Sequence, residues 1–226
     1  MPARRAITPP PPNAALAISA IKVVRHDPRC VTVHVAGEPA ARIWADDIHP
    51  LDLSVGLAWD DGVADRVAEA HARCEAARAA VRLISIKPRT ASELVTKLRA
   101  KGHTPEHAKA AVDRLAASGL IDDAAVARST AASIVARQPA GARLIEAKLR
   151  ARGVPQQAAR DAARDALADH DPLEDATALA RKHARSMASL ERDVAKRRIL
   201  GRLARRGFDT EVALAATDAV LADRNT

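Results

Sequence analysis

Apolar and polar residues alternate near the start of the chain. The run from Val31 to Val35 places valine at every second position, which is the period of a strand with one buried face. Polar turn sequences at residues 26–29 and 37–39 separate this run from apolar segments on either side. The pattern predicts a small three-stranded antiparallel meander within residues 16–59.

The apolar period then lengthens to three and four residues, the spacing of an amphipathic helix. Val67, Cys74 and Val81 fit this spacing, and the pattern predicts a linking helix within residues 60–88 with these side chains on its buried face. Residues 1–15, before the first strand, are rich in proline and poor in apolar residues. They predict a disordered proline-rich arm.

The remainder of the chain repeats itself. Three stretches are near copies, with their leucines 51 and then 54 residues apart: Leu98-Arg-Ala-Lys-Gly102, Leu149-Arg-Ala-Arg-Gly153 and Leu203-Ala-Arg-Arg-Gly207. Each stretch ends a basic helix at a glycine, and a polar helix start and an alanine-rich helix follow. We predict helical repeats over 89–139, 140–190 and 191–226, the last truncated to two helices.

The composition agrees with this organisation. Hydrophobic residues make up 48% of the chain, yet there are two Trp, one Phe and no Tyr, and alanine is the largest contributor. Alanine favours helices and buries little area. The predicted fold class is mainly α, with tandem three-helix repeats in an elongated array, a small N-terminal antiparallel β meander and a linking helix.

Charge and cysteine usage narrow the class of partner. The formal net charge of +8 favours a polyanion, because Lys and Arg that neutralise phosphates release counterions. A basic surface that is merely well solvated stays an alternative. No apolar run approaches the ~18 residues of a membrane span, so we expect a cytoplasmic protein without a membrane partner. Cys30 and Cys74 form no CxxC pattern and are expected to be free thiols.

Alignment of the three stretches on their leucines separates core from surface. The residues four positions before the leucines are apolar and share the leucines' helix face, which predicts core. The residue before each leucine and the third residue after it are basic in every repeat, which predicts a basic stripe for binding DNA or a filament. The stripe comprises Lys97, Lys148 and Arg202, then Lys101, Arg152 and Arg206, with Arg99, Arg150 and Arg205 in support. Favourable interaction of cations with helix C-termini is the alternative explanation.

Base reading and catalysis find little support. The second helix of a repeat begins with proline or carboxylates, as at Pro105-Glu106, which disfavours insertion into a DNA groove. Aromatic platforms for stacking single-stranded bases are nearly absent. His103 and His107 lack a third metal ligand nearby, and no glycine-rich phosphate loop occurs. We expect no enzyme, cofactor or metal, and assign the acidic pairs to helix capping: Asp46-Asp47, Asp60-Asp61 and Asp122-Asp123.

Three features carry a resemblance to a known family: Arg89-Thr-Ala-Ser-Glu-Leu-Val-Thr-Lys-Leu98, Gly119-Leu-Ile-Asp-Asp123, and the basic junctions ending in Arg205-Arg-Gly-Phe208. With them, residues from about 60 to 222 resemble the RecX regulators of bacterial recombination, and the β segment resembles an extension of some members. Val126 departs from the pattern, which has an aromatic residue in that helix.

The resemblance implies a curved array with a basic concave face, lying in the groove of the RecA filament on single-stranded DNA. It implies inhibition of the filament's ATPase, strand exchange and coprotease activities, and hence a role in recombination, DNA repair and the SOS response. The basic stripe would contact phosphates of single-stranded DNA, with duplex DNA as a further candidate. We expect a monomer.

The Gly119–Asp123 segment is assigned to folding, with Gly119 as a helix stop, Leu120 and Ile121 as core and Asp122 as a cap. Two alternative functions stay open. One is a general DNA-binding protein that does not read sequence, and the other is a helical scaffold for protein partners.

Overall fold

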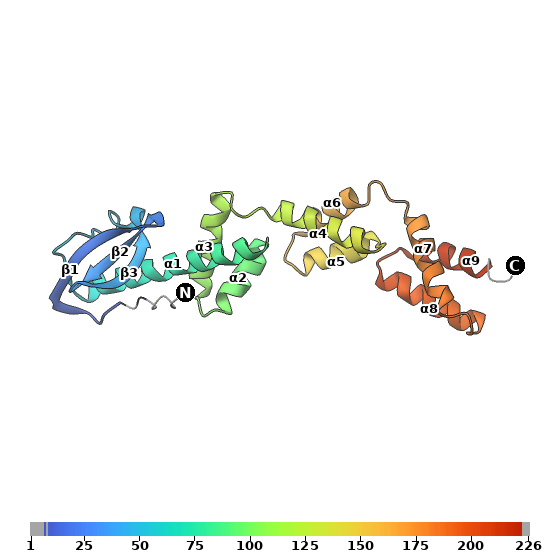
Figure 1. The fold of residues 1–226 in the computed structure, drawn as a ribbon, viewed down its shortest axis with the longest axis horizontal. Helices are drawn as coiled ribbons and strands as arrows, with labels where there is room; N and C mark the ends of the chain where they lie inside the picture. Colours follow the sequence, from blue (N-terminus) through green and yellow to red (C-terminus); the bar gives the residue numbers. More distant parts are fainter. Residues whose placement is uncertain (1–6, 8, 223–226) are drawn as a thin grey trace. The chain divides into compact units, whose positions relative to one another are not determined.

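The computed structural model describes residues 7 and 9–222 (Figure 1). Helices and one small antiparallel sheet account for its regular structure, which confirms the mainly helical class with an N-terminal β segment. The chain divides into two compact units. The first contains the chain up to Pro88 together with Leu94–Ile121, and the second contains Arg89–Glu93 together with the chain from Asp122 onward.

The first unit begins with a sheet of four strands in the order β3-β2-β1-β4. The three predicted strands form the meander, and a short fourth strand pairs with the outer side of β1. Val31, Val33 and Val35 are all buried, as their alternation predicts. The strands are β1 (Asn13–Val24), β2 (Asp27–Val35), β3 (Glu38–Trp44) and β4 (Ala58–Trp59).

The proline-rich segment is anchored to this sheet where the structure describes it. Residues 1–6 and 8 of the predicted disordered arm lie outside the described residues. The prediction is wrong for Asn13–Ala15, which start β1. The reason is Trp59, whose indole Nε1 donates a hydrogen bond to the carbonyl of Pro10 at 3.2 Å, while its backbone pairs with Asn13.

Helix α1 (Asp61–Ile86) covers the sheet and then continues past it to pack on α3 (Figure 1). Asp60 caps it as predicted, since its carboxylate accepts a hydrogen bond from the Val63 amide at 2.8 Å. Val67 lies in the core between helix and sheet. Val81 does not follow the prediction: its side chain is 40% exposed, because the sheet ends before it and α3 covers other positions.

The two cysteines meet between β2 and α1. Their Sγ atoms lie 3.8 Å apart, and both thiols are buried and free. Burial, with the neighbouring Asp27 carboxylate, raises the pKa of Cys30 to about 11, and burial raises the pKa of Cys74 further still. Both side chains therefore stay neutral and serve the core as small apolar groups.

Helices α2 (Ala91–Arg99) and α3 (Pro105–Ala117) follow α1. Leu94 and Leu98 are fully buried, as the repeat alignment predicts. The assignment of Leu120 to the core is wrong, because its side chain is 48% exposed. It follows the glycine that ends α3, where the chain leaves the helix before Asp122 caps the next one through the Ala125 amide.

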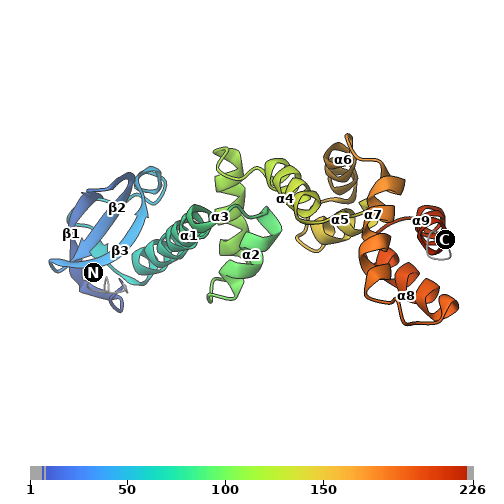
Figure 2. The same ribbon diagram turned by 45° about the vertical axis from the view of Figure 1, so that its right-hand side comes forward.

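The second unit contains two groups of three helices (Figure 2). One core joins the first group and another joins the second, so α7 packs with α8 and α9. The structure thus groups the helices one helix earlier than the sequence boundaries 89–139, 140–190 and 191–226, and the last group has three helices rather than two. The helices are α4 (Asp123–Arg137), α5 (Ala142–Arg150), α6 (Gln156–Ala166), α7 (Pro172–Arg185), α8 (Arg192–Arg205) and α9 (Thr210–Ala222).

The glycines that end the repeated stretches differ in their surroundings. All have positive φ, which glycine adopts without strain. Gly102 faces open space, whereas a Cβ on Gly207 would overlap the backbone nitrogen of Leu144, and one on Gly153 would overlap Ser92. The second and third junctions are therefore close contacts between helices.

This difference gives a stability test. Gly102→Ala meets only the backbone cost of a left-handed alanine, about 1 kcal/mol. Gly207→Ala adds overlap with Leu144, so we expect a loss of about 3 kcal/mol or more. Denaturant unfolding followed by circular dichroism measures both losses. Equal losses for the two variants would contradict a close contact at Gly207.

Candidate nucleic-acid interface

The first column of the predicted basic stripe is exposed in two of its three members. Lys97 lies in the last turn of α2 and Lys148 in the last turn of α5, and both side chains are exposed. Within the described residues, neither lysine forms an ion pair. Both are therefore available for an external anion.

In the second column, Arg152 is held inside the second unit. Its guanidinium forms a bidentate ion pair with Glu93, with Nε to Oε1 at 2.9 Å and Nη2 to Oε2 at 3.0 Å, and also donates to the hydroxyl of Thr130. Both partners of the ion pair are about three-quarters buried. The bond to Glu93 raises the pKa of Arg152. This guanidinium fixes the fold.

Arg206 is held in a similar way, by carbonyl groups instead of a carboxylate. Its Nε donates to the carbonyl of Pro139 at 2.9 Å, and its Nη2 donates to the carbonyl of Gln138 at 2.7 Å. Burial lowers the pKa of Arg206, since no carboxylate offsets the cost of taking the charge out of water. Gln138 and Pro139 follow α4, so the guanidinium binds the backbone just before α5.

Arg152 and Arg206 occupy the same place in their repeats. Their backbone carbonyls also accept hydrogen bonds from residues at equivalent positions. The Arg152 carbonyl accepts a hydrogen bond from the Thr90 hydroxyl at 2.5 Å, and the Arg206 carbonyl accepts one from the Gly141 amide at 2.9 Å. Thr90 and Gly141 both stand just before the first helix of a repeat. We call each contact between an Arg-Gly junction and such a helix start a joint.

Three other residues of the stripe are exposed and lie outside the joints. Arg99 and Arg150 occupy the last turns of α2 and α5, and Lys101 follows α2. Lys101 is in register with Arg152 and Arg206, yet no hydrogen bond or ion pair holds its side chain among the residues that the structure describes.

Helix α8 gathers the densest positive charge of the second unit. A hollow of about 430 Å³ lies on its surface, and no acidic residue lines it. Positions 198, 202 and 205 share a helix face because they are separated by four and three residues. Mid-helix Gly201 adds no side chain to the floor, so a ligand can approach the backbone there. The lining residues are Arg197, Arg198, Gly201, Arg202 and Arg205.

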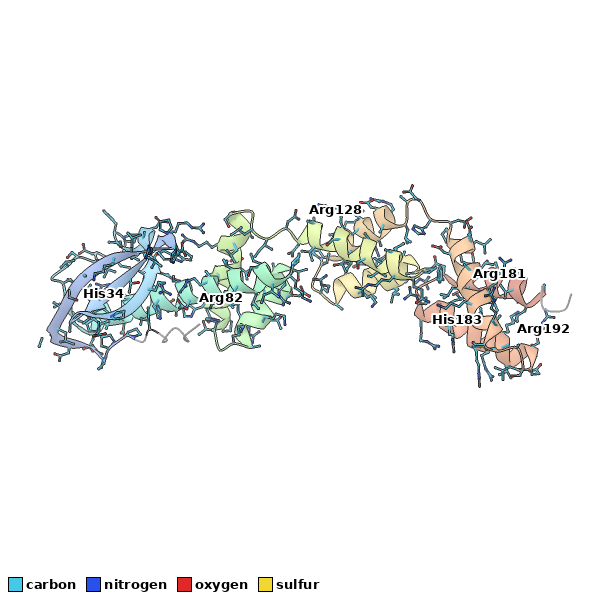
Figure 3. All side chains as sticks on the ribbon, in the orientation of Figure 1. His34, Arg82, Arg128, Arg181, His183 and Arg192 are labelled. Carbon is cyan, nitrogen blue, oxygen red and sulfur yellow. The ribbon has the colours of Figure 1, made fainter. Side chains whose placement is uncertain are left out.

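His183 on α7 supports one of these arginines (Figure 3). The Arg202 Nη1 lies 2.7 Å from His183 Nδ1, which fits a neutral imidazole accepting a hydrogen bond from the guanidinium. Burial lowers the pKa of His183, and the charges of Arg202 and Lys182 lower it further. The neutral ring orients Arg202 without neutralising it.

The structure therefore brings together Arg202 and Arg205 of the predicted stripe. It adds Arg198, which thickens the stripe in the last repeat, and Arg197, which the alignment missed. Arg197 has no basic counterpart in the first repeat, where Ser92 stands in register. The signal available in the sequence was the cluster of arginines at helical spacing around a mid-helix glycine.

The other candidate groups have structural roles. His107 Nε2 lies 2.9 Å from the Glu69 carboxylate, so it ties α3 to α1. The described residues contain no cluster of three or more His, Cys, Asp or Glu side chains suited to a metal. Within them, no helix has both the length and the apolar character needed to cross a bilayer.

Comparison with known proteins matches two of the helical groups. Residues 76–115 match the family model of the first three-helix domain of RecX, and residues 169–217 match that of the third. The regulatory protein RecX of Mycobacterium avium is 37% identical over 155 residues, which cover 66% of this chain and 87% of that protein. The chain belongs to the RecX family.

Other relatives agree with this assignment. The regulatory protein RecX of Thermobifida fusca is 33% identical over 66% of this chain and 77% of its own length. A crystal structure of a regulatory protein RecX superposes with a TM-score of 0.72 over 90% of this chain and 99% of its own, at 23% identity. RecX from Lactobacillus salivarius gives a TM-score of 0.54 over 66% of this chain and 96% of its own, at 21% identity. The first matched domain begins within α1, at residue 76, and the third begins at residue 169, just before α7.

The ion pair of the first joint predicts an energetic coupling. In a double-mutant cycle with Glu93→Gln and Arg152→Met, we expect a coupling energy of about 2 kcal/mol, because the pair is bidentate and mostly buried. The exposed pair Arg143 and Asp209, 2.8 Å apart, is the matched control, with about 0.5 kcal/mol expected for Arg143→Met and Asp209→Asn. Denaturant unfolding measures both. A coupling energy at the first joint no larger than that of the control would show that the Glu93–Arg152 pair does not stabilise the fold.

His183 predicts a pH dependence. Because its pKa in the folded state lies below the ordinary value of 6.5, the unfolded chain takes up the proton first. The contribution to stability is complete above about pH 6.5 and is lost as the pH falls through the folded-state pKa. Thermal unfolding between about pH 7 and about pH 5 should therefore show a larger loss in the wild type than in His183→Gln, whose amide oxygen still accepts from Arg202. Parallel profiles would show that His183 does not titrate in this way.

Proposed function

We propose that this RecX-family chain is a non-enzymatic regulator that binds the RecA filament on single-stranded DNA. Binding lowers the filament's ATPase, strand exchange and coprotease activities and thereby tunes recombination, DNA repair and the SOS response. Membership of a family whose relatives are named regulatory proteins supports a regulatory role. The proposal carries no catalytic step and no cofactor.

The arginine hollow on α8 is the observation that carries the proposal. Four guanidiniums line it without a carboxylate among them. Elsewhere on α8, Lys196 is paired with Asp218 at 2.6 Å, so this helix neutralises a cation where no ligand is needed. Guanidiniums bind phosphate oxygens in bidentate fashion and stay charged at any physiological pH.

The exposed residues of the predicted stripe add further cations to the proposal, in each unit taken by itself. Lys148 and Arg150 add charge within the second unit, and Lys97, Arg99 and Lys101 add charge within the first. Arg152 and Arg206 are left out of the proposed interface, because their guanidiniums already hold the joints. The contacts are to phosphates, so we expect binding without sequence preference and with strong salt dependence.

The test is a titration of the chain into RecA with single-stranded DNA and ATP, with ATP hydrolysis as the readout. Wild type is expected to inhibit at substoichiometric amounts. Arg198→Glu with Arg205→Glu should raise the concentration for half-inhibition about tenfold or more, since each lost phosphate contact costs about 1 kcal/mol. The matched control is Arg128→Glu with Arg137→Glu, which changes two exposed arginines of α4 and alters the net charge equally.

Two outcomes would contradict the proposal. If both double variants inhibit alike, the α8 hollow is not part of the interface. If wild type binds naked DNA tightly and leaves ATP hydrolysis unchanged, the chain is a general DNA-binding protein instead.

A further inference from the structure

A second basic cleft lies in the first unit, outside the repeated helices of the stripe. Its volume is about 990 Å³, and four segments wall it: the turn between β1 and β2, the strand β3, the second half of α1, and the end of α3 with the residues that follow. This volume is at the upper end of what small-molecule sites enclose. The cleft therefore has room for a short length of an extended polymer.

The charge of this cleft is uneven. Three carboxylates, those of Asp27, Glu75 and Asp46, pair with four of the arginines that line it. The remaining two, Arg25 and Arg82, form no ion pair among the described residues, and Figure 3 labels Arg82. Lysine is absent from the lining. The arginines are Arg25, Arg29, Arg42, Arg78, Arg82 and Arg114.

The paired arginines are held in fixed positions. Arg78 Nη1 lies 2.7 Å from the Glu75 carboxylate, and Arg42 Nη1 lies 3.5 Å from the same oxygen. One carboxylate shared by two guanidiniums leaves positive charge uncompensated at the floor of the cleft. The Nε of Arg42 is also buried and has no hydrogen-bond partner within the described part of the chain. A preorganised cationic floor of this kind suits an anion.

The lining also contains a cation–π pair that could stack a base. The Arg114 guanidinium lies over the Trp44 ring, 4.3 Å from its centroid, and its side chain is 47% exposed. Trp44 and Arg114 both line the cleft. Guanidinium planes stack nucleobases as aromatic rings do. Val81 and Leu120, the two predicted inward residues that are exposed, also line the cleft.

We infer that this cleft binds a short stretch of single-stranded nucleic acid, with phosphates against the arginines and a base stacked on Arg114. A single-stranded nucleic acid can contact the arginines with its phosphates, and the planar and apolar groups with its bases. An acidic peptide would use the arginines alone. The inference goes beyond the proposed function, since it assigns a binding site to the β segment and its helices, and it does not require RecA.

The site is tested on the full chain by fluorescence anisotropy with a labelled oligothymidylate across a salt series. Arg25→Glu with Arg82→Glu should weaken binding about tenfold or more and reduce the logarithmic salt slope by about 1.4, which is about 0.7 for each of two lost phosphate contacts. The matched control, Lys22→Glu with Arg66→Glu, alters two exposed cations of the same unit that do not line the cleft. It should weaken binding less than about threefold. Equal losses in both double variants would overturn the inference.

Stacking has its own readout. Wild type should bind the oligothymidylate more tightly than an abasic strand of equal length, and Arg114→Ala should lose about tenfold of that preference. No preference in the wild type would exclude a stacked base. Displacement of the oligothymidylate by polyglutamate at equal charge concentration would favour an acidic peptide and overturn the inference.

Photocrosslinking separates this site from the α8 hollow and does not depend on a stable variant. A strand carrying thiothymidine should crosslink to the tryptic peptides that contain Trp44 or Leu120. These crosslinks should persist in Arg198→Glu with Arg205→Glu, whatever that variant does to RecA. Crosslinks confined to the second unit would overturn the inference and leave the proposed function standing.

Discussion

The fold of the second unit depends on the close approach of backbone at each joint. At Gly153 and Gly207 the chain has positive φ and stands where a Cβ would overlap another helix start, so glycine is required twice over. The arginine just before each glycine then reaches across and binds groups at that helix start. Because helices rich in alanine bury little area, such directed polar contacts fix the register that a thicker core would otherwise fix.

The two joints solve the same geometric problem with different chemistry. Arg152 finds a carboxylate at Glu93, while Arg206 finds only main-chain carbonyls. The positions in register with Glu93 are Leu144 in the second repeat and Arg198 in the third. This position therefore holds an ion-pair partner in the first repeat, an apolar residue in the second and an arginine of the α8 hollow in the third. The face that receives a junction in the first two repeats becomes the arginine hollow in the third.

The helices themselves could be predicted from the sequence, because caps and glycine stops are local signals. Helix ends follow the caps and the glycine stops, so α1 lies within the predicted 60–88, and α2, α5 and α8 end just before the glycines of the repeated stretches. The grouping of helices could not be read in the same way, because the repeated stretch marks a helix end and does not say which neighbour the helix packs on. Arg152 and Lys148 look alike in the alignment. Only the fold brings Glu93, 59 residues away, to one of them.

The small number of aromatic residues led us to predict little base stacking. A stacking surface was not expected, since the chain has two Trp, one Phe and no Tyr. The structure builds a flat platform from a tryptophan and an arginine on separate elements, β3 and α3. Composition counts aromatic rings, but a guanidinium is also planar, and no sequence pattern shows that Arg114 lies over Trp44.

Helix α8 begins about one turn earlier in the repeat than α2 and α5 do. Thr90 and Gly141 stand before their helices, whereas Ala195, in register with them, is buried inside α8. No helix start is left there to receive another junction. A fourth repeat added by gene duplication would have to dock over Arg197 and Arg198 and would cover their charge. The surface that a further junction would need is thus the one that carries exposed arginines of α8.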